Sequence, residues 1–376
     1  MVASDFPERF AVNWFRPVVG RRACSPIHAF LLVYLLSAVG CGADGTSDAQ
    51  FKSQIVSAMH QLVLSEVVGL NQAASDLQAA APAPVGRGWD ATLDQQPIAD
   101  MKDAWVRMRA NWEQAEGTLE CLFPDLDTSM DSRYEELLAP LGATGDPDPF
   151  DGVGITGMHA VERILYAPVT PLAVIAYESS LAGSLTAAWP ATEAEAADFK
   201  GGLCQRLVTD TQTLLDDWKP LAVDLPAVFQ GITGLMSAQT EKVGLAVQRR
   251  EESRYSQMTM ADLRFNLAGT QGIYDLFQPW LGTKAYGTTL DNSATTALTG
   301  LAAIYATVVG DAIPPPPDSW NSAMPSLSDQ QSPFGQLYEA VVQEVDPSRS
   351  GSAVEAMNQV AKALGLPAFT GQTCGQ

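Results

Sequence analysis

Apolar residues recur three and four positions apart along most of the chain, and this spacing is typical of amphipathic helices. The pattern predicts one long helix over residues 54–80 and a second over residues 98–121. In the second, Trp105, Met108 and Trp112 lie on one face and are expected to fill a core. Further helices are expected at about 132–139, 152–167, 171–188, 193–217, 225–254, 259–281, 289–310, 332–345 and 351–364.

Strand-like alternation of apolar and polar residues is almost absent, so the sequence predicts an all-α fold. The helical domain, taken as residues 51–370, is too long for one simple four-helix bundle. We therefore expect two packed helical bundles, divided near residues 190–225. The proline run 314–317 would form a rigid, exposed connector.

The first 40 residues have a different pattern, which is typical of an export signal. A basic segment precedes an apolar run at residues 29–40, and this run is too short to span a bilayer comfortably. It ends in Ala-Val-Gly-Cys, which resembles a bacterial lipobox with Cys41 as the lipidated residue. We therefore predict a lipoprotein-type signal peptide over residues 1–40, a polar tether over residues 41–50, and a lipid anchor in the periplasm or cell envelope. The alternative is an ordinary signal peptide followed by a chance cysteine.

The chain is strongly acidic, with a formal net charge of −21. Residues 1–40 contain four basic and two acidic residues, so the remainder carries a net charge of −23. Such a surface repels nucleic acid and anionic lipid headgroups, and it attracts cations. The charge therefore excludes a nucleic-acid partner and leaves the lipid anchor as the expected membrane contact.

Three cysteines follow Cys41, namely Cys121, Cys204 and Cys374. Two of them could form a disulfide in an exported protein, and the odd number would leave one thiol. No Cys-x-x-Cys pair occurs, so the sequence supports neither a thiolate zinc site nor a redox pair.

The segment 157–162 reads Gly-x-His-x-x-Glu inside a predicted helix. Because His159 and Glu162 are three residues apart, their side chains lie on one helical face. An imidazole and a carboxylate placed together supply half of a metal site. His28 lies in the leader, and we interpret His60 as an ordinary helix residue.

Three further acidic segments accompany this helix. Glu113 and Glu116 are again three residues apart, residues 125–133 suggest an acidic turn that enters the next helix, and residues 251–255 fall at the far end of a predicted long helix. Each segment alone is typical of a solvated helix face. Helical bundles nevertheless build metal sites by projecting Glu and His inward at this spacing.

In this order, the segments 112–116, 125–133, 157–162 and 252–269 resemble the imelysin-like family, and within it the EfeO/EfeM branch. That branch is the exported component of the Efe iron-uptake system, and the likeness runs through most of residues 51–365. The resemblance implies an imelysin-like helical domain that binds iron as its cargo. The metal contacts that it implies are His159, Glu162, Glu113, Glu116, Asp131 and Glu252.

An insertion at residues 139–151 departs from the family pattern and leaves open whether Asp127 or Asp131 is the acidic ligand. Carboxylate oxygens with one imidazole suit iron, manganese or zinc, and the lack of thiolate or Met clusters argues against Cu(I). Arg133 is expected to orient a carboxylate beside the metal. Arg163 is expected on the surface.

The leading hypothesis is a non-enzymatic protein that captures a metal cation for uptake. A metallopeptidase, the activity for which the wider family is named, is the first alternative, although the chain has no His-Glu-x-x-His motif and no second histidine near His159. A helical scaffold that binds a partner protein is the second alternative. A membrane permease or a peroxidase-like subunit of the same uptake system would be compatible with the leading hypothesis.

Overall fold

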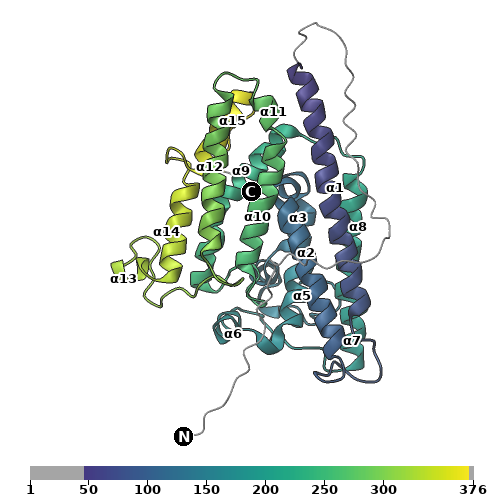
Figure 1. Cartoon of the computed structure of the whole chain (residues 1–376). Coiled ribbons are helices and arrows are strands. Elements are labelled where there is room, and N and C mark those ends of the chain that lie inside the picture. The colour runs from purple at the N-terminus through teal and green to yellow at the C-terminus, as the bar shows by residue number, and fades with distance from the viewer. Residues whose placement is uncertain (1–45, 372–376) are drawn as a thin grey trace, which may run out of the picture. The chain divides into compact units, whose positions relative to one another are not determined.

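Two long antiparallel helices, α1 (Asp48–Ala80) and α2 (Gln95–Leu122), run side by side through the fold (Figure 1). The computed structural model describes residues 46–371, so the predictions for the leader, Cys41 and Cys374 lie outside the described residues. The α1 helix begins at a capping box on Ser47, and its buried face carries apolar side chains at helical spacing. The buried face of α2 carries Trp105 and Trp112, as the sequence predicts.

The remaining helices follow in short succession and pack around this pair. They are α3 (Pro124–Asp131), α4 (Tyr134–Leu138), α5 (Gly157–Leu165), α6 (Leu172–Ser179), α7 (Glu193–Asp198), α8 (Cys204–Trp218), α9 (Leu225–Gly244), α10 (Thr259–Asp275), α11 (Gln278–Leu281), α12 (Gly287–Ala306), α13 (Leu327–Gln330), α14 (Pro333–Val345) and α15 (Ala353–Leu364). The described residues contain no strand, and the all-α bundle prediction is confirmed.

Helix α2 is the central element, because it packs against α1 and also against α9 and α10. Helices α12, α14 and α15 pack with one another, α14 and α15 also pack on α9, and α12 packs on α10. The division into two bundles near residues 190–225 stays a prediction.

Glycines allow α9 and α10 to approach α2 closely. A Cβ atom on Gly231 of α9 would lie 2.0 Å from the carbonyl oxygen of Gly117, and one on Gly269 of α10 would lie 2.0 Å from the carbonyl oxygen of Gln114. Both distances are far below van der Waals contact, so only glycine fits at either position. These contacts hold α9 and α10 against the face of α2 that carries Glu113 and Glu116.

Several predicted elements differ from the structure. The helix predicted over residues 171–188 ends at Ser179, and the one predicted over residues 259–281 is divided into α10 and α11. The helix predicted over residues 225–254 ends at Gly244, a short 3₁₀ segment continues to Gln248, and the chain then turns before α10. Arg249 and Gln257 adopt positive φ values of 62° and 61° in this turn. The predicted acidic turn at 125–133 is mostly helix α3, which begins with Pro124 in its first turn.

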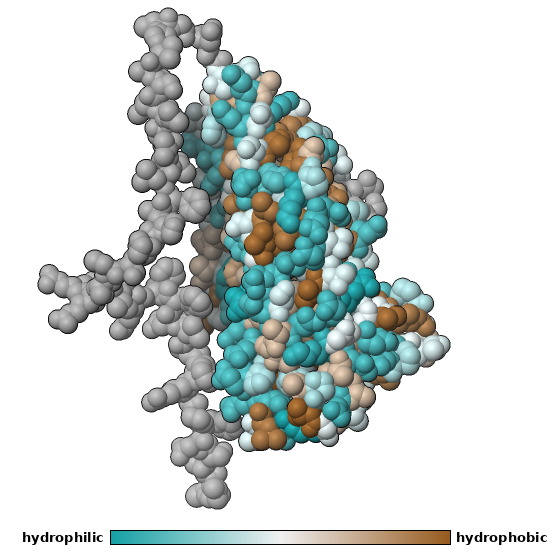
Figure 2. Space-filling model, turned by 90° about the vertical axis from the view of Figure 1, so that its right-hand side faces the viewer, coloured by the Kyte–Doolittle hydropathy of each residue, from teal (hydrophilic) through white to brown (hydrophobic). Residues whose placement is uncertain are grey.

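The surface agrees with the polar composition. Figure 2 shows a face that is mostly hydrophilic, with its hydrophobic residues in small separate groups. Within residues 46–371, every helix is either too short or too polar to span a bilayer. Of the described cysteines, Cys121 is disulfide-bonded, and Cys204 is a free, buried thiol on α8.

Candidate metal centre

A cluster of carboxyl groups lies where α2, α3, α5, α9 and α10 meet. Five elements supply its members: α2, the end of α3, α5, the turn after α9, and α10. All of the side chains are buried or nearly so, the most accessible being 12% exposed. The members are Glu113, Glu116, Asp131, Glu162, Glu252 and Asp262.

The innermost group of this cluster is Glu113, Glu252 and Asp262. One carboxylate oxygen from each lies within 4.8 Å of the others. Both oxygens of Asp262 and Oε2 of Glu252 are buried without a hydrogen-bond partner. Burial of this kind disfavours the charged form and raises the pKa of Asp262 to about 6. Among the oxygens of the innermost group, these three would therefore gain the most from a bound cation.

Arg109 is the central positive charge of the cluster. This buried side chain pairs with Glu113 and Asp131, and it lies 3.5 Å from Asp262 and 3.8 Å from Glu252. Burial acts to raise the pKa of Asp131, but Arg109 and the neighbouring imidazole outweigh it and hold that pKa below its ordinary value. Arg109 thus joins the innermost group to the group around the imidazole.

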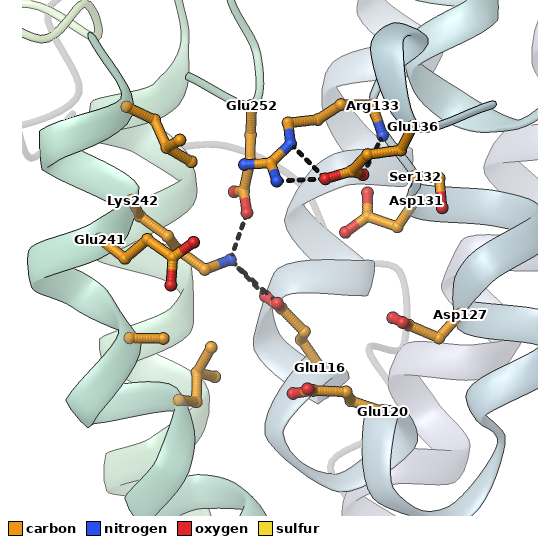
Figure 3. Close-up of a pocket in the computed structure, with 13 residues that line it drawn as sticks. Glu116, Glu120, Asp127, Asp131, Ser132, Arg133, Glu136, Glu241, Lys242 and Glu252 are labelled. Carbon is orange, nitrogen blue, oxygen red and sulfur yellow. Dashed lines mark hydrogen bonds and ion pairs between the residues drawn. The ribbon is translucent and has the colours of Figure 1, made fainter. Parts of the chain in front are cut away.

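Lys242 of α9 and Asn266 of α10 hold the two carboxylates of α2. The ammonium of Lys242 lies 2.9 Å from Oε1 of Glu116 and 2.6 Å from Oε1 of Glu252 (Figure 3). The Asn266 amide donates to Glu113 at 2.5 Å and to Glu116 at 2.6 Å. Both side chains are buried, so these polar groups replace water around the carboxylates.

The predicted pair of His159 and Glu162 forms, with Nδ1 of the imidazole 3.0 Å from Oε2 of the carboxylate. Oε1 of Glu162 accepts hydrogen bonds from the backbone N–H of Tyr255 at 3.1 Å and Ser256 at 2.8 Å, and from the Ser256 hydroxyl at 2.7 Å. Nε2 of His159 lies 3.3 Å from Oδ1 of Asp131. Because both oxygens of Glu162 are engaged, this carboxylate orients the imidazole so that Nε2 faces the rest of the cluster.

The imidazole carries a charge of its own in this setting. Burial and Arg109 act to lower the pKa of His159, but its contacts with Asp131 and Glu162 outweigh them and raise the pKa to about 9. Six carboxyl groups are therefore accompanied by three basic side chains, those of Arg109, Lys242 and His159. The carboxyl groups outnumber the basic side chains, so the cluster retains an excess of negative charge.

An acidic cavity of about 210 Å³ opens beside the cluster. Figure 3 shows its charged side chains, which come from α2, α3, α4, α9 and the segments that directly follow α3 and α9. Burial and the neighbouring carboxylates raise the pKa of Asp127 to about 8 and that of Glu120 to about 7. The acidic side chains that line the cavity are Glu116, Glu120, Asp127, Asp131, Glu136, Glu241 and Glu252.

The predicted residues are thus brought into one network, although they do not converge on a single point. The innermost carboxylates and the imidazole group are separate sets, joined through Arg109. Of the two alternatives for the acidic position, Asp131 contacts His159, whereas Asp127 lines the cavity. Arg133 also lines the cavity, where it pairs with Glu136, which is outside the predicted ligand set.

Arg163 is buried, so its predicted surface position is wrong. Its Nε lies 2.9 Å from Glu178, and its guanidinium packs over the ring of Tyr134. Arg254 is also buried and pairs with the same Glu178 at 3.3 Å. The helix that carries Arg163 is buried on every side, and the spacing of its residues alone does not reveal this.

His60 stacks on Trp218, where α1 packs against α8.

Sequence reasoning missed four members of the network: Arg109, Lys242, Asp262 and Asn266. Asp262 and Asn266 fall inside the stretch 252–269 that carries the family resemblance, and this position in the sequence is the signal that points to them. Arg109 shares the apolar face of α2, and a basic residue on such a face is a signal that could have found it.

The fold and the site define an all-α protein with a buried, carboxylate-rich centre. The family model for imelysin, named peptidase M75, matches residues 56–333, which is most of the chain, and the chain therefore belongs to the imelysin family. No curated protein matches the sequence. A solved structure from Parabacteroides distasonis, provisionally described as an iron-regulated protein A precursor, has a TM-score of 0.48 and 14% identity, with coverage of 86% of this chain and 95% of that chain.

Proposed function

We propose that the protein captures a metal cation, iron in the first place, at the buried carboxylate centre. The observation that carries this proposal is the innermost group, in which oxygens of Glu113, Glu252 and Asp262 lie within 4.8 Å of one another. The buried oxygens of Asp262 have no hydrogen-bond partner. Burying carboxylate oxygens without hydrogen-bond partners is costly, and Arg109, 3.5 Å from Asp262, offsets only part of that cost, so a bound cation would relieve the rest.

The ligand atoms that the cluster offers to a captured metal, carboxylate oxygens and one imidazole nitrogen, suit a hard or borderline cation. Carboxylate oxygens from the innermost group, with Asp131 and Nε2 of His159 beside them, match the preferences of iron, manganese and zinc once the metal has displaced the proton that the imidazole holds. Glu162 would fix the orientation of the imidazole rather than hold the metal directly. The acidic cavity would raise the local concentration of cations at the entrance.

The setting of this capture is an exported protein of the EfeO/EfeM type, held by a lipid anchor on Cys41. This part rests on the leader and on the motif order along the chain. The released metal would pass to a membrane permease or to a peroxidase-like subunit of the same uptake system.

The geometry favours capture over zinc-dependent peptide hydrolysis. Hydrolytic zinc sites hold the metal with three protein ligands, often including two histidines, and leave a position for water. Within the described part of the chain, His159 is the one histidine in the cluster, because His60 packs against Trp218.

Metal titration of the chain lacking residues 1–41 tests the proposal. Anaerobic calorimetry with Fe(II), and then with Mn(II) and Zn(II), should show stoichiometric binding. We expect Asp262→Asn and His159→Ala each to weaken binding at least about tenfold, because each removes a donor. Asp216→Asn, a matched change at an exposed carboxylate of α8, should leave affinity unchanged. A wild-type protein that binds none of these cations, with its helical circular dichroism intact, would refute the capture function.

A further inference from the structure

The ammonium of Lys242 is surrounded by carboxylate oxygens as a bound cation would be. It lies 2.6 Å from Glu252 Oε1, 2.9 Å and 3.2 Å from the two oxygens of Glu116, and 4.0 Å from Glu113 Oε2. Lys242 is only 6% exposed, so little water shares these contacts. The protein thus supplies its own cation to carboxylates that could otherwise hold a metal.

Lys242 lies between the acidic cavity and the innermost carboxylates. Its side chain lines the cavity together with Glu116 and Glu252, and Figure 3 shows the ammonium between these two carboxylates. Glu252 reaches both regions, because its Oε1 contacts the ammonium while the same carboxylate belongs to the innermost group. A cation that moves from the cavity to the innermost group therefore meets the carboxylates that Lys242 occupies.

The two buried basic side chains on this route differ in how firmly they are held. The guanidinium of Arg109 has four carboxylates within 4.0 Å, whereas the Lys242 ammonium sits on a flexible stem that lines an open cavity. Asn266 also donates to Glu113 and Glu116, so these two carboxylates keep a hydrogen-bond partner if the ammonium leaves. The same cavity is lined by the further acidic side chains Glu120, Asp127 and Glu241, toward which a displaced ammonium could turn.

We propose that Lys242 is a displaceable internal cation: an incoming metal replaces its ammonium on Glu116 and Glu252, and the ammonium returns when the metal leaves. This proposal rests on the capture function. It adds that competition from the Lys242 ammonium limits the affinity of the site for the metal. Since two cations on one carboxylate pair repel each other, the metal must displace Lys242 to bind. The affinity is thereby kept low enough for the cargo to be released.

Removal of the charge on Lys242 tests this. Lys242→Met keeps most of the stem and deletes the ammonium, so Fe(II), and Mn(II) as its redox-stable counterpart, should bind at least about tenfold more tightly than to the wild type. Lys219→Met is the matched control, because this exposed lysine pairs with Asp216 away from the cavity, and its affinity should stay unchanged. Unchanged or weaker binding by Lys242→Met would overturn the displacement.

Labelling of the wild-type protein gives a second measurement that needs no variant to fold. An amine-reactive reagent followed by mass spectrometry should modify Lys242 slowly without metal and at least about fivefold faster at Mn(II) saturation, with Lys219 unchanged. Saturation by metal without faster labelling would overturn the displacement and leave the capture function intact. If the wild type binds no cation, both proposals fail. If Lys242→Met does not fold, the labelling result decides alone.

Discussion

Helix α10 approaches α2 closely at Gly269, and we expect the candidate site to depend on this contact. A Cβ atom at Gly269 would lie 2.0 Å from the carbonyl oxygen of Gln114, whereas ordinary contact begins at 3.4 Å. The obstructing atom belongs to the backbone, so it cannot turn away as a side chain could. Gly269→Ala must therefore push the two helices apart by about 1 Å.

Two opposing contributions set the change in the free energy of unfolding that Gly269→Ala causes. Overpacking of this kind costs about 1–3 kcal/mol, and the better helix propensity of alanine returns about 1 kcal/mol. Because a rigid backbone lies opposite Gly269, we expect the upper end of the range and a net loss of about 2 kcal/mol. The separation should also stretch the bonds from Asn266 to Glu113 and Glu116, and so weaken metal binding.

Gly272 on the same helix provides the control. A Cβ atom there would meet only the side chain of Leu62, at 3.8 Å, so Gly272→Ala should be neutral or stabilising by up to about 1 kcal/mol. Urea unfolding followed by circular dichroism, with the slopes compared to verify one cooperative transition, measures both variants. Equal stability of the Gly269→Ala and Gly272→Ala proteins would refute this account of the helix contact.

Three further outcomes are expected. Ser256→Ala removes the hydroxyl that donates to Glu162 at 2.7 Å, so it should lower the free energy of unfolding in urea by about 1–2 kcal/mol and weaken metal binding. Ser256→Thr keeps a hydroxyl, and a Ser256→Thr protein that behaves like Ser256→Ala would contradict the role of the hydroxyl. Asp127 has a pKa of about 8, so the folded protein keeps a proton that the unfolded chain loses near pH 4, and stability without metal should fall as the pH rises between these values. Asp127→Asn should flatten that slope in urea unfolding measured at several pH values with a chelator present, and an unaltered slope would count against the raised pKa. Burial raises the pKa of the Cys204 thiol, so iodoacetamide should modify Cys204 in unfolded protein and not in native protein; rapid modification of native protein would contradict its burial.

Periodicity predicted the helices well where one face of each is apolar, and it failed where tertiary contacts end a helix. Helix α9 ends at Gly244 even though helical spacing continues to residue 254. The chain reverses through Arg249 and Gln257 at positive φ, and neither residue is the glycine that normally signals such a turn. Hydrogen bonds from this turn to Glu162 help to hold it, and they join residues more than 90 positions apart. No local pattern contains that information.

Spacing predicted the pairs on a single helix and could not predict their counter-ions. The three-residue interval brought His159 and Glu162 to 3.0 Å. Lys242 reaches Glu116 from another helix, 126 positions along the chain, and a lysine in a sequence normally indicates a solvated face. The same rule predicts a surface position for Arg163, which is buried in the structure, and its partner Glu178 again comes from a different helix.

The two buried basic side chains explain how so many carboxyl groups can lie together in the interior of the protein. Six carboxyl groups could not be buried together unpaired, and Arg109 and Lys242 neutralise part of their charge in the structure. If both cations were fixed, a metal would enter against their repulsion; if both were absent, the carboxylates would repel one another before it arrived. Arg109, held by four carboxylates, maintains the arrangement, and Lys242, facing the cavity, can give up its place. Under the proposed displacement, exchange of one ammonium for a divalent cation would add one positive charge to a cluster in which carboxyl groups outnumber basic side chains, and this would favour binding.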